Sequence, residues 1–116
     1  MMAALINKTT NQTLVPDLKV AKTFWSRGKG LLGRASLPQE EALWILRCNS
    51  IHTFFMQFSI DCVFVDKNLK VKAIYEDVRP GRLVFPVWGA SSVIEMSAGS
   101  VSKMKVSVGD QLYVGA

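Results

Sequence analysis

The chain has 116 residues, of which 49% are hydrophobic and 20% charged, and its formal net charge is +5. This length and composition fit one globular domain that can bury a core unaided, and they exclude a disordered chain. The 14 Lys and Arg residues are spread along the sequence and do not form the clustered basic stripe of a nucleic-acid surface. Nucleic acid is therefore not an expected partner.

The N-terminal segment bears on where the protein acts. Residues 1–6 are apolar, but Asn7 and Lys8 follow at once, which leaves the stretch too short for a signal-peptide core. No later run is long enough to cross a membrane. We therefore expect a cytoplasmic protein with no membrane partner. Cys48 and Cys62 then read as small buried hydrophobes, with a disulfide between them as the alternative.

Short apolar and alternating runs predict a chain built mainly of strands. After a short strand and a turn closed by Pro16-Asp17, the expected strands are residues 18–22, 42–46, 60–66, 69–75, 83–88, 93–96 and 111–114. Thr23 is placed to cap a helix over residues 24–34, and Ser100 to cap a single helical turn through Met104. The fold class is therefore mainly β, a single small β-sandwich or open barrel with one or two short helices.

The hairpin between residues 60 and 75 has the most definite local geometry. A two-residue loop at Lys67-Asn68 would place Phe64 opposite Val71 and Cys62 opposite Ala73. This register puts only apolar side chains on one face, and a slip by one residue would mix the two faces. We therefore predict this register.

Several motifs, in order along the chain, carry a resemblance to a known family. They are residues 27–34 (RGKGLLGR), the run 48–66, and residues 93–99 (VIEMSAG) followed by 108–112 (VGDQL). With them, the chain resembles the DUF192 family (domain of unknown function 192) of small bacterial and archaeal proteins.

The resemblance covers residues from about 19 to 114, within a single domain over residues 1–116. It implies a compact, β-rich, sandwich-like domain with small helices. It implies no activity, because the family has no established biochemical role.

Two patterns suggest chemistry but lack a required part. Residues 28–33 match GxGxxG, yet no βαβ unit follows, as a dinucleotide site requires. Cys48, His52 and Met56 are soft metal ligands, but on extended chain each step of four residues spans about 13 Å, too far for one ion. We therefore expect neither a cofactor nor a metal.

Two acids lie in otherwise apolar strands. Burying an unpaired carboxylate is costly, so Asp61 needs a partner, and we expect a structural ion pair with Lys72 or, alternatively, Arg34. Glu95 lies in a second apolar strand, but nothing in the sequence places it beside Asp61. No catalytic pair of carboxylates is therefore expected.

The candidate ligand-binding residues are His52, Asp61, Arg34 and Met56, with no catalytic residue assigned. The first three are polar or ionisable residues in apolar stretches where packing alone would select Val or Leu. The predicted function is a non-catalytic binding or scaffold module for a small polar or anionic ligand or a protein partner. The alternative is a small hydrolytic or metal-dependent enzyme that uses His52 and Asp61.

Overall fold

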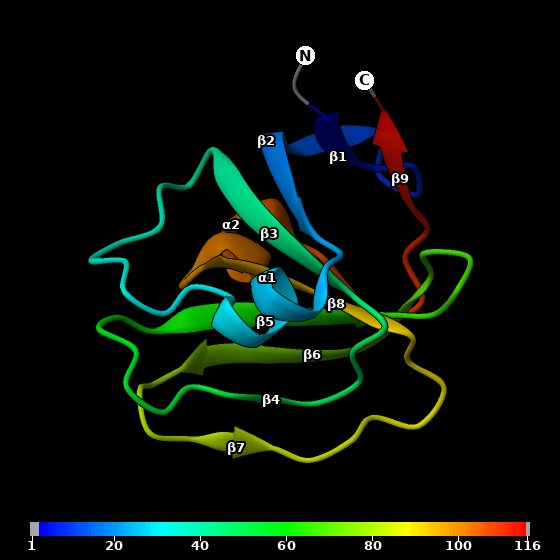
Figure 1. Ribbon diagram of the computed structural model, residues 1–116. Coiled ribbons are helices and arrows are strands. Elements are labelled where there is room, and N and C mark those ends of the chain that lie inside the picture. Colours follow the sequence, from blue (N-terminus) through cyan, green and yellow to red (C-terminus); the bar gives the residue numbers. More distant parts are fainter. Residues whose placement is uncertain (1–2, 116) are drawn as a thin grey trace.

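The computed structural model describes residues 3–115, apart from the side chain of Phe24. Its strands are β1 (Ala3–Asn7), β2 (Gln12–Ala21), β3 (Glu41–Leu46), β4 (Ile51–His52), β5 (Ile60–Val65), β6 (Val71–Val78), β7 (Leu83–Val84), β8 (Ser92–Ser97) and β9 (Leu112–Gly115). Its helices are α1 (Phe24–Lys29) and α2 (Ser100–Met104). The prediction of a mainly β protein with one or two short helices is confirmed, and there are two helices in the described residues (Figure 1). Neither helix is long or apolar enough to span a bilayer.

Seven strands form one curled sheet, a half-barrel, in the order β6-β5-β8-β3-β2-β1-β9. Neighbouring strands are antiparallel except β2 and β3, which are parallel. The two ends of the sheet approach each other, because the Val71 amide donates to the Asp110 carbonyl at 2.9 Å. β4 and β7 form a separate two-stranded sheet below β6 in Figure 1.

The core has two parts, one on each face of the curled sheet. The first lies inside the curl and combines side chains of every strand of this sheet with Val101 of α2. The second lies on the opposite face of the central strands, under a cover made by residues 30–38, β4 and β7. Strand β5 has every residue buried because it contributes to both parts. A polar side chain in β5 or β8 is therefore enclosed whichever way it points.

The predicted hairpin forms between β5 and β6, but its predicted register is wrong. Cys62 lies opposite Tyr75 rather than Ala73, and Phe64 lies opposite Ala73. The cause is the connection, where Leu69 takes a positive φ of 66° and Asp66 Oδ1 accepts two backbone amides. Between Cys62 and Phe64 the slip is two residues, so these side chains keep their predicted face. A register shift after Phe64 places Val71 opposite Val65, however, so Val71 packs inside the curl and not on the predicted face with Phe64.

The structure also corrects three local expectations. Pro16 lies within β2 rather than closing a turn. Thr23 caps α1 as predicted, since its side chain and that of Ser26 each accept the other's backbone amide at 3.0 Å. The helix ends at Lys29, however, because Gly30 leaves the helical region with φ 50°. Finally, α2 begins at Ser100, but Gly99 occupies its cap position and supplies no capping side chain.

Candidate functional site

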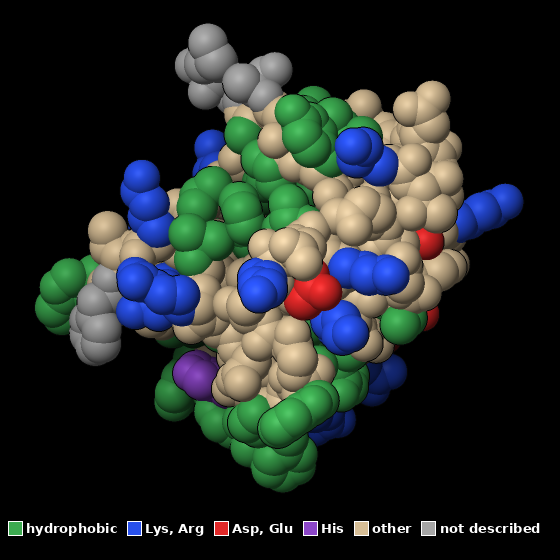
Figure 2. Space-filling model, turned by 90° about the vertical axis from the view of Figure 1, so that its right-hand side faces the viewer, with side chains coloured by type: hydrophobic (Ala, Val, Ile, Leu, Met, Phe, Trp, Pro, Cys, Tyr) green, Lys and Arg blue, Asp and Glu red, His purple; other side chains and the backbone are tan. Residues whose placement is uncertain are grey.

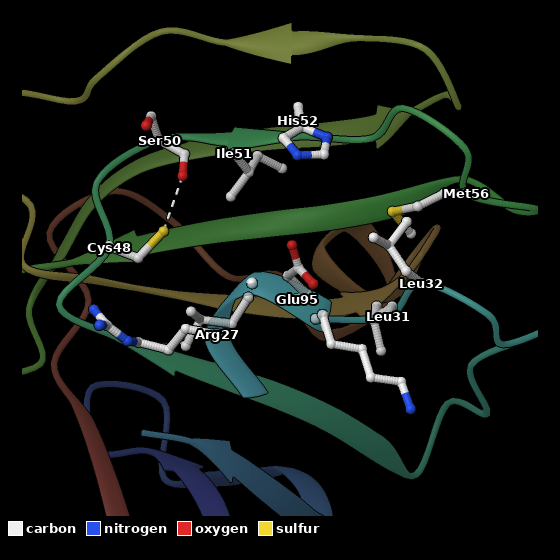
Figure 3. A pocket seen from close by; sticks show the side chains of 13 residues that line it. Arg27, Leu31, Leu32, Cys48, Ser50, Ile51, His52, Met56 and Glu95 are labelled. Atoms are coloured by element: carbon white, nitrogen blue, oxygen red, sulfur yellow. Dashed lines mark hydrogen bonds between the residues drawn. The ribbon is translucent and has the colours of Figure 1, made fainter. Parts of the chain in front are cut away.

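A cavity of about 240 Å³ lies against the second part of the core (Figure 3). Residues 27–32 form one wall, Cys48, residues 50–52 and Met56 line the opposite side, and Ile45 and Glu95 project from β3 and β8. We call this cavity the Glu95 pocket. Ligand sites for drug-sized molecules usually measure roughly 300–1,000 Å³, so this pocket suits a smaller ligand.

Glu95 is the charged residue that the fold encloses most fully beside this pocket. It lies in the middle of β8, between Leu43 of β3 and Cys62 of β5. Side chains alternate along a strand, so Glu95 shares its face with Val93, which belongs to the second part of the core. Only 4% of Glu95 is exposed. A carboxyl group therefore occupies an apolar position.

The Glu95 carboxyl group has no hydrogen-bond or ion-pair partner within residues 3–115. Burial raises its pKa from 4.5 to about 7, because an apolar surrounding disfavours the charged form. Figure 3 shows the carboxyl pointing into the space between α1 and β4. The pocket thus presents an unsatisfied acceptor that is near its point of ionisation at neutral pH.

Gly30 shows why a glycine is needed at one position of the glycine-rich motif, residues 28–33. Its φ of 50° ends α1, and a Cβ atom built on it would lie 3.9 Å from Glu95 Oε1 and 3.8 Å from Ile45 Cδ1. The backbone after α1 therefore passes close above the carboxyl. Since a positive φ favours glycine, the motif shapes the wall of this pocket. The parallel strands β2 and β3 and the helix α1 between them do form a β-α-β connection, contrary to the expectation from sequence. The glycines of residues 28–33 lie at the end of α1, however, whereas a dinucleotide site needs them between the strand and the start of the helix.

Arg27 contributes a second unsatisfied group to the same pocket. Its Nη1 donates to the Arg47 carbonyl at 3.3 Å, whereas its Nε is buried and has no hydrogen-bond partner. No ion pair joins Arg27 to Glu95 among the described residues. A donor and an acceptor of opposite charge therefore line one cavity without satisfying each other.

The two cysteines are free thiols. Burial raises the pKa of both, and that of Cys62 strongly, so both are protonated at neutral pH. Cys48 lines the pocket and donates its S–H to the Ser50 carbonyl at 2.9 Å. A protonated thiol that already donates a hydrogen bond is a poor nucleophile, so the pocket is not built for cysteine chemistry.

Of the four predicted site residues, the structure brings two together. His52 and Met56 both line the Glu95 pocket. The Met56 side chain is buried, while His52 is exposed and stacks on Phe54 with 5.2 Å between the ring centroids. Arg34 lies outside this pocket and pairs with Glu41 at 2.5 Å.

Asp61, the fourth residue, lies on the other face of the sheet, where its neighbour Val63 packs inside the curl. Its expected ion pair with Lys72 or Arg34 is wrong. The carboxylate instead accepts backbone amides, from Asp77 at 2.8 Å, Gly99 at 3.1 Å and Val101 at 2.9 Å. Asp61 thus supplies the cap that α2 lacks locally, and the fold does not join it to His52 in one site.

Glu95 is the functional candidate that the sequence-based set omits. The available signal is its position, an acid alternating with apolar residues within β8. Asp61 also lies between apolar residues, in β5. Only the tertiary structure shows that Asp61 has hydrogen-bond partners and that Glu95 has none among the described residues. Among residues 3–115, no three His, Cys, Asp or Glu side chains are grouped closely enough to hold a metal ion.

The loop after β4 places aromatic surface beside the pocket. Phe54 stacks on His52, and Phe55 is 90% exposed with a positive φ of 66°. Figure 2 shows hydrophobic side chains gathered next to this histidine. A bulky residue in the left-handed region is strained, and here the strained residue points into solvent.

Comparison with known proteins identifies relatives over nearly the whole chain. Residues 5–114 match the model of a family described as "DUF192: Uncharacterized ACR, COG1430". A UPF0127 protein of Thermococcus sibiricus is 34% identical over 93% of this chain and 72% of its own length. A UPF0127 protein of Pyrococcus abyssi is 33% identical over 96% of this chain and 97% of its own.

Two crystal structures are similar in fold. A protein of unknown function from Novosphingobium aromaticivorans superimposes with a TM-score of 0.81 at 20% identity, over 96% of this chain and 82% of its own. A protein of Sinorhizobium meliloti gives 0.80 at 20% identity, over 97% and 91%. At this identity the similarity establishes the half-barrel fold alone.

Proposed function

The chain belongs to the DUF192 family, which is described as uncharacterised, and from the geometry of its pocket we propose that it binds a small ligand that donates a hydrogen bond to Glu95. The observation that carries this proposal is the Glu95 carboxyl group, 4% exposed and without a hydrogen-bond partner in the described part of the chain. A ligand carrying an ammonium, amidinium or amide group would satisfy it.

The remaining walls suit such a ligand. Leu31, Ile45 and Ile51 provide apolar surface around the carboxyl, and apolar walls with a few placed polar groups are typical of small-molecule sites. Burying a polar group without a partner costs about 1–3 kcal/mol, and more for a charge. A structural role would be better served by Leu or Val, so the carboxyl at this position favours ligand binding.

Binding is better supported than catalysis. The enzyme alternative requires His52 and Asp61 in one site, whereas Asp61 is committed to three backbone amides on the other face of the sheet. Cys48 is a protonated thiol that donates to a carbonyl. The pocket therefore offers recognition by Glu95 without a nucleophile beside it.

The proposal is tested with n-propylamine, a cation small enough for the pocket. At pH 8, where Glu95 is ionised, isothermal titration calorimetry should detect binding to the wild-type protein. Hydrogen bonds to charged groups are worth about 1.5–3 kcal/mol, so Glu95→Gln should weaken binding by about tenfold or more. Because the cation needs the ionised carboxyl, affinity should also fall as pH drops below about 7.

Arg34→Gln is the matched control, because Arg34 lies outside the Glu95 pocket and pairs with Glu41. It should leave the affinity for propylamine unchanged. Equal affinity of the wild-type and Glu95→Gln proteins, or no binding at all at pH 8, would contradict the proposal.

A protein partner is the second candidate, favoured by the strained and exposed Phe55. Replacing Phe55 with a photo-crosslinking phenylalanine analogue in cells should yield one adduct of defined mass. Tyr113, 50% exposed on β9, serves as the control position. The same adducts at both positions would show non-specific contact and would remove this candidate.

A further inference from the structure

We propose that the ligand of the Glu95 pocket has two ends: a hydrogen-bond donor that contacts Glu95 and an acceptor, most simply a carboxylate, that contacts Arg27. This inference rests on the proposed binding function and names the class of ligand. Short-chain amino acids have the required chemistry.

Arg27 is the group that the first proposal leaves unexplained. Nη1 of its guanidinium donates to the Arg47 carbonyl at 3.3 Å, which holds the side chain along the pocket wall. The neighbouring Nε–H is buried and unpartnered. A guanidinium carries five N–H donors and can offer two of them in parallel to a carboxylate, and only one nitrogen of Arg27, Nη1, is used by the Arg47 carbonyl.

Arg27 and Glu95 also fail to satisfy each other. Both line the pocket, and both carry an unpartnered polar atom, yet no ion pair joins them. In Figure 3 the guanidinium lies on the side of Cys48, away from the Glu95 carboxyl. A cationic and an anionic side chain that line one pocket without pairing can both be satisfied by one molecule that carries an acceptor and a donor.

The space between the two groups constrains what joins the ends of the ligand. Ile45 and Ile51 line the pocket with apolar side chains, and the total volume is about 240 Å³. A short alkyl linker fits such walls, whereas a sugar or a nucleotide would place hydroxyl groups against them. The class is therefore a small zwitterion with an apolar middle.

The test compares two-ended probes with one-ended ones at pH 8. The probes are 4-aminobutanoate, 5-aminopentanoate, n-propylamine and butanoate, each titrated calorimetrically into the wild-type protein. At least one amino acid should bind about tenfold more tightly than propylamine, as expected for one added charge-assisted contact. Arg27→Gln should remove this advantage, and propylamine should bind to the variant at least as tightly as to the wild type, because the variant lacks a positive charge that repels the ammonium group.

Controls separate this inference from the function on which it rests. Arg27→Lys keeps the charge but loses the planar fork, so it should recover only part of the advantage, and it replaces Arg27→Gln if that variant does not fold. Arg34→Gln should change nothing. If propylamine binds through Glu95 but no amino acid binds more tightly, the two-ended ligand is wrong and the binding function stands. If no amine binds, the binding function itself fails.

Discussion

Replacing Glu95 with leucine is expected to raise the free energy of unfolding at pH 8 by about 3 kcal/mol. Burial raises the pKa of Glu95 from 4.5 to about 7, and one pKa unit corresponds to about 1.36 kcal/mol between the two protonation states. At pH 8 the folded protein therefore carries a buried charge without a partner. Leucine removes that charge and suits the apolar surroundings.

The gain in the free energy of unfolding of Glu95→Leu over wild type should depend on pH. Below pH 4.5 Glu95 is protonated in the folded and unfolded chains, so the ionisation penalty is absent. Between pH 4.5 and about 7 only the unfolded chain releases the proton, and wild-type stability falls as pH rises. The difference between the Glu95→Leu and wild-type proteins should rise through this window and then level off.

Urea unfolding from pH 4 to pH 8 measures this difference. Glu40→Leu, at an exposed position, controls for the general effect of adding a leucine. A Glu95→Leu protein that is less stable than wild type at pH 8 would mean that Glu95 serves the fold. A stability difference that does not change with pH would mean that folding does not raise the Glu95 pKa. Either result would contradict the buried, unpartnered carboxyl on which the proposed pocket rests.

Replacing Asp61 with asparagine should instead destabilise the protein, by about 3 kcal/mol. Asp61 is 0% exposed and accepts three backbone amides, including those of Gly99 and Val101 at the start of α2. An asparagine has one acceptor oxygen, so its NH₂ group must face at least one of these donors. Each buried donor left without an acceptor costs about 1–3 kcal/mol, and the loss of the charge weakens the contacts that remain.

Asp66 provides the matched control, because its Oδ1 also accepts two backbone amides, from Asn68 and Lys70, but in an exposed turn. An asparagine keeps one acceptor oxygen that can serve both amides, and the turn is open to water, so Asp66→Asn should cost much less in the same urea unfolding experiment. Equal losses for the two variants would show that neither the burial of Asp61 nor its use of both carboxylate oxygens sets its contribution. Near-native stability of Asp61→Asn would contradict its role as the cap of α2.

Local sequence determined the elements and their apolar faces. Alternation in residues 93–96 and 111–114 predicted β8 and β9, and each predicted bound lies one residue from the observed bound. Thr23 marked the start of α1, because a cap acts on amides only two or three residues away. In the hairpin, residues 62–64 keep their predicted faces, but the register differs and Val71 changes face, since Asp66 and Leu69 shape a longer turn than the expected one.

The candidate site depended on contacts between distant parts of the chain. Asp61 and Glu95 look alike in sequence, each an acid within an apolar strand. Asp61 faces the start of α2, where free backbone amides satisfy it across 38 residues or more, whereas Glu95 faces the apolar cover formed after α1 and has no partner among residues 3–115. Strand periodicity sets which face a side chain takes, but only the packing of α1, α2 and β4 decides what that face meets.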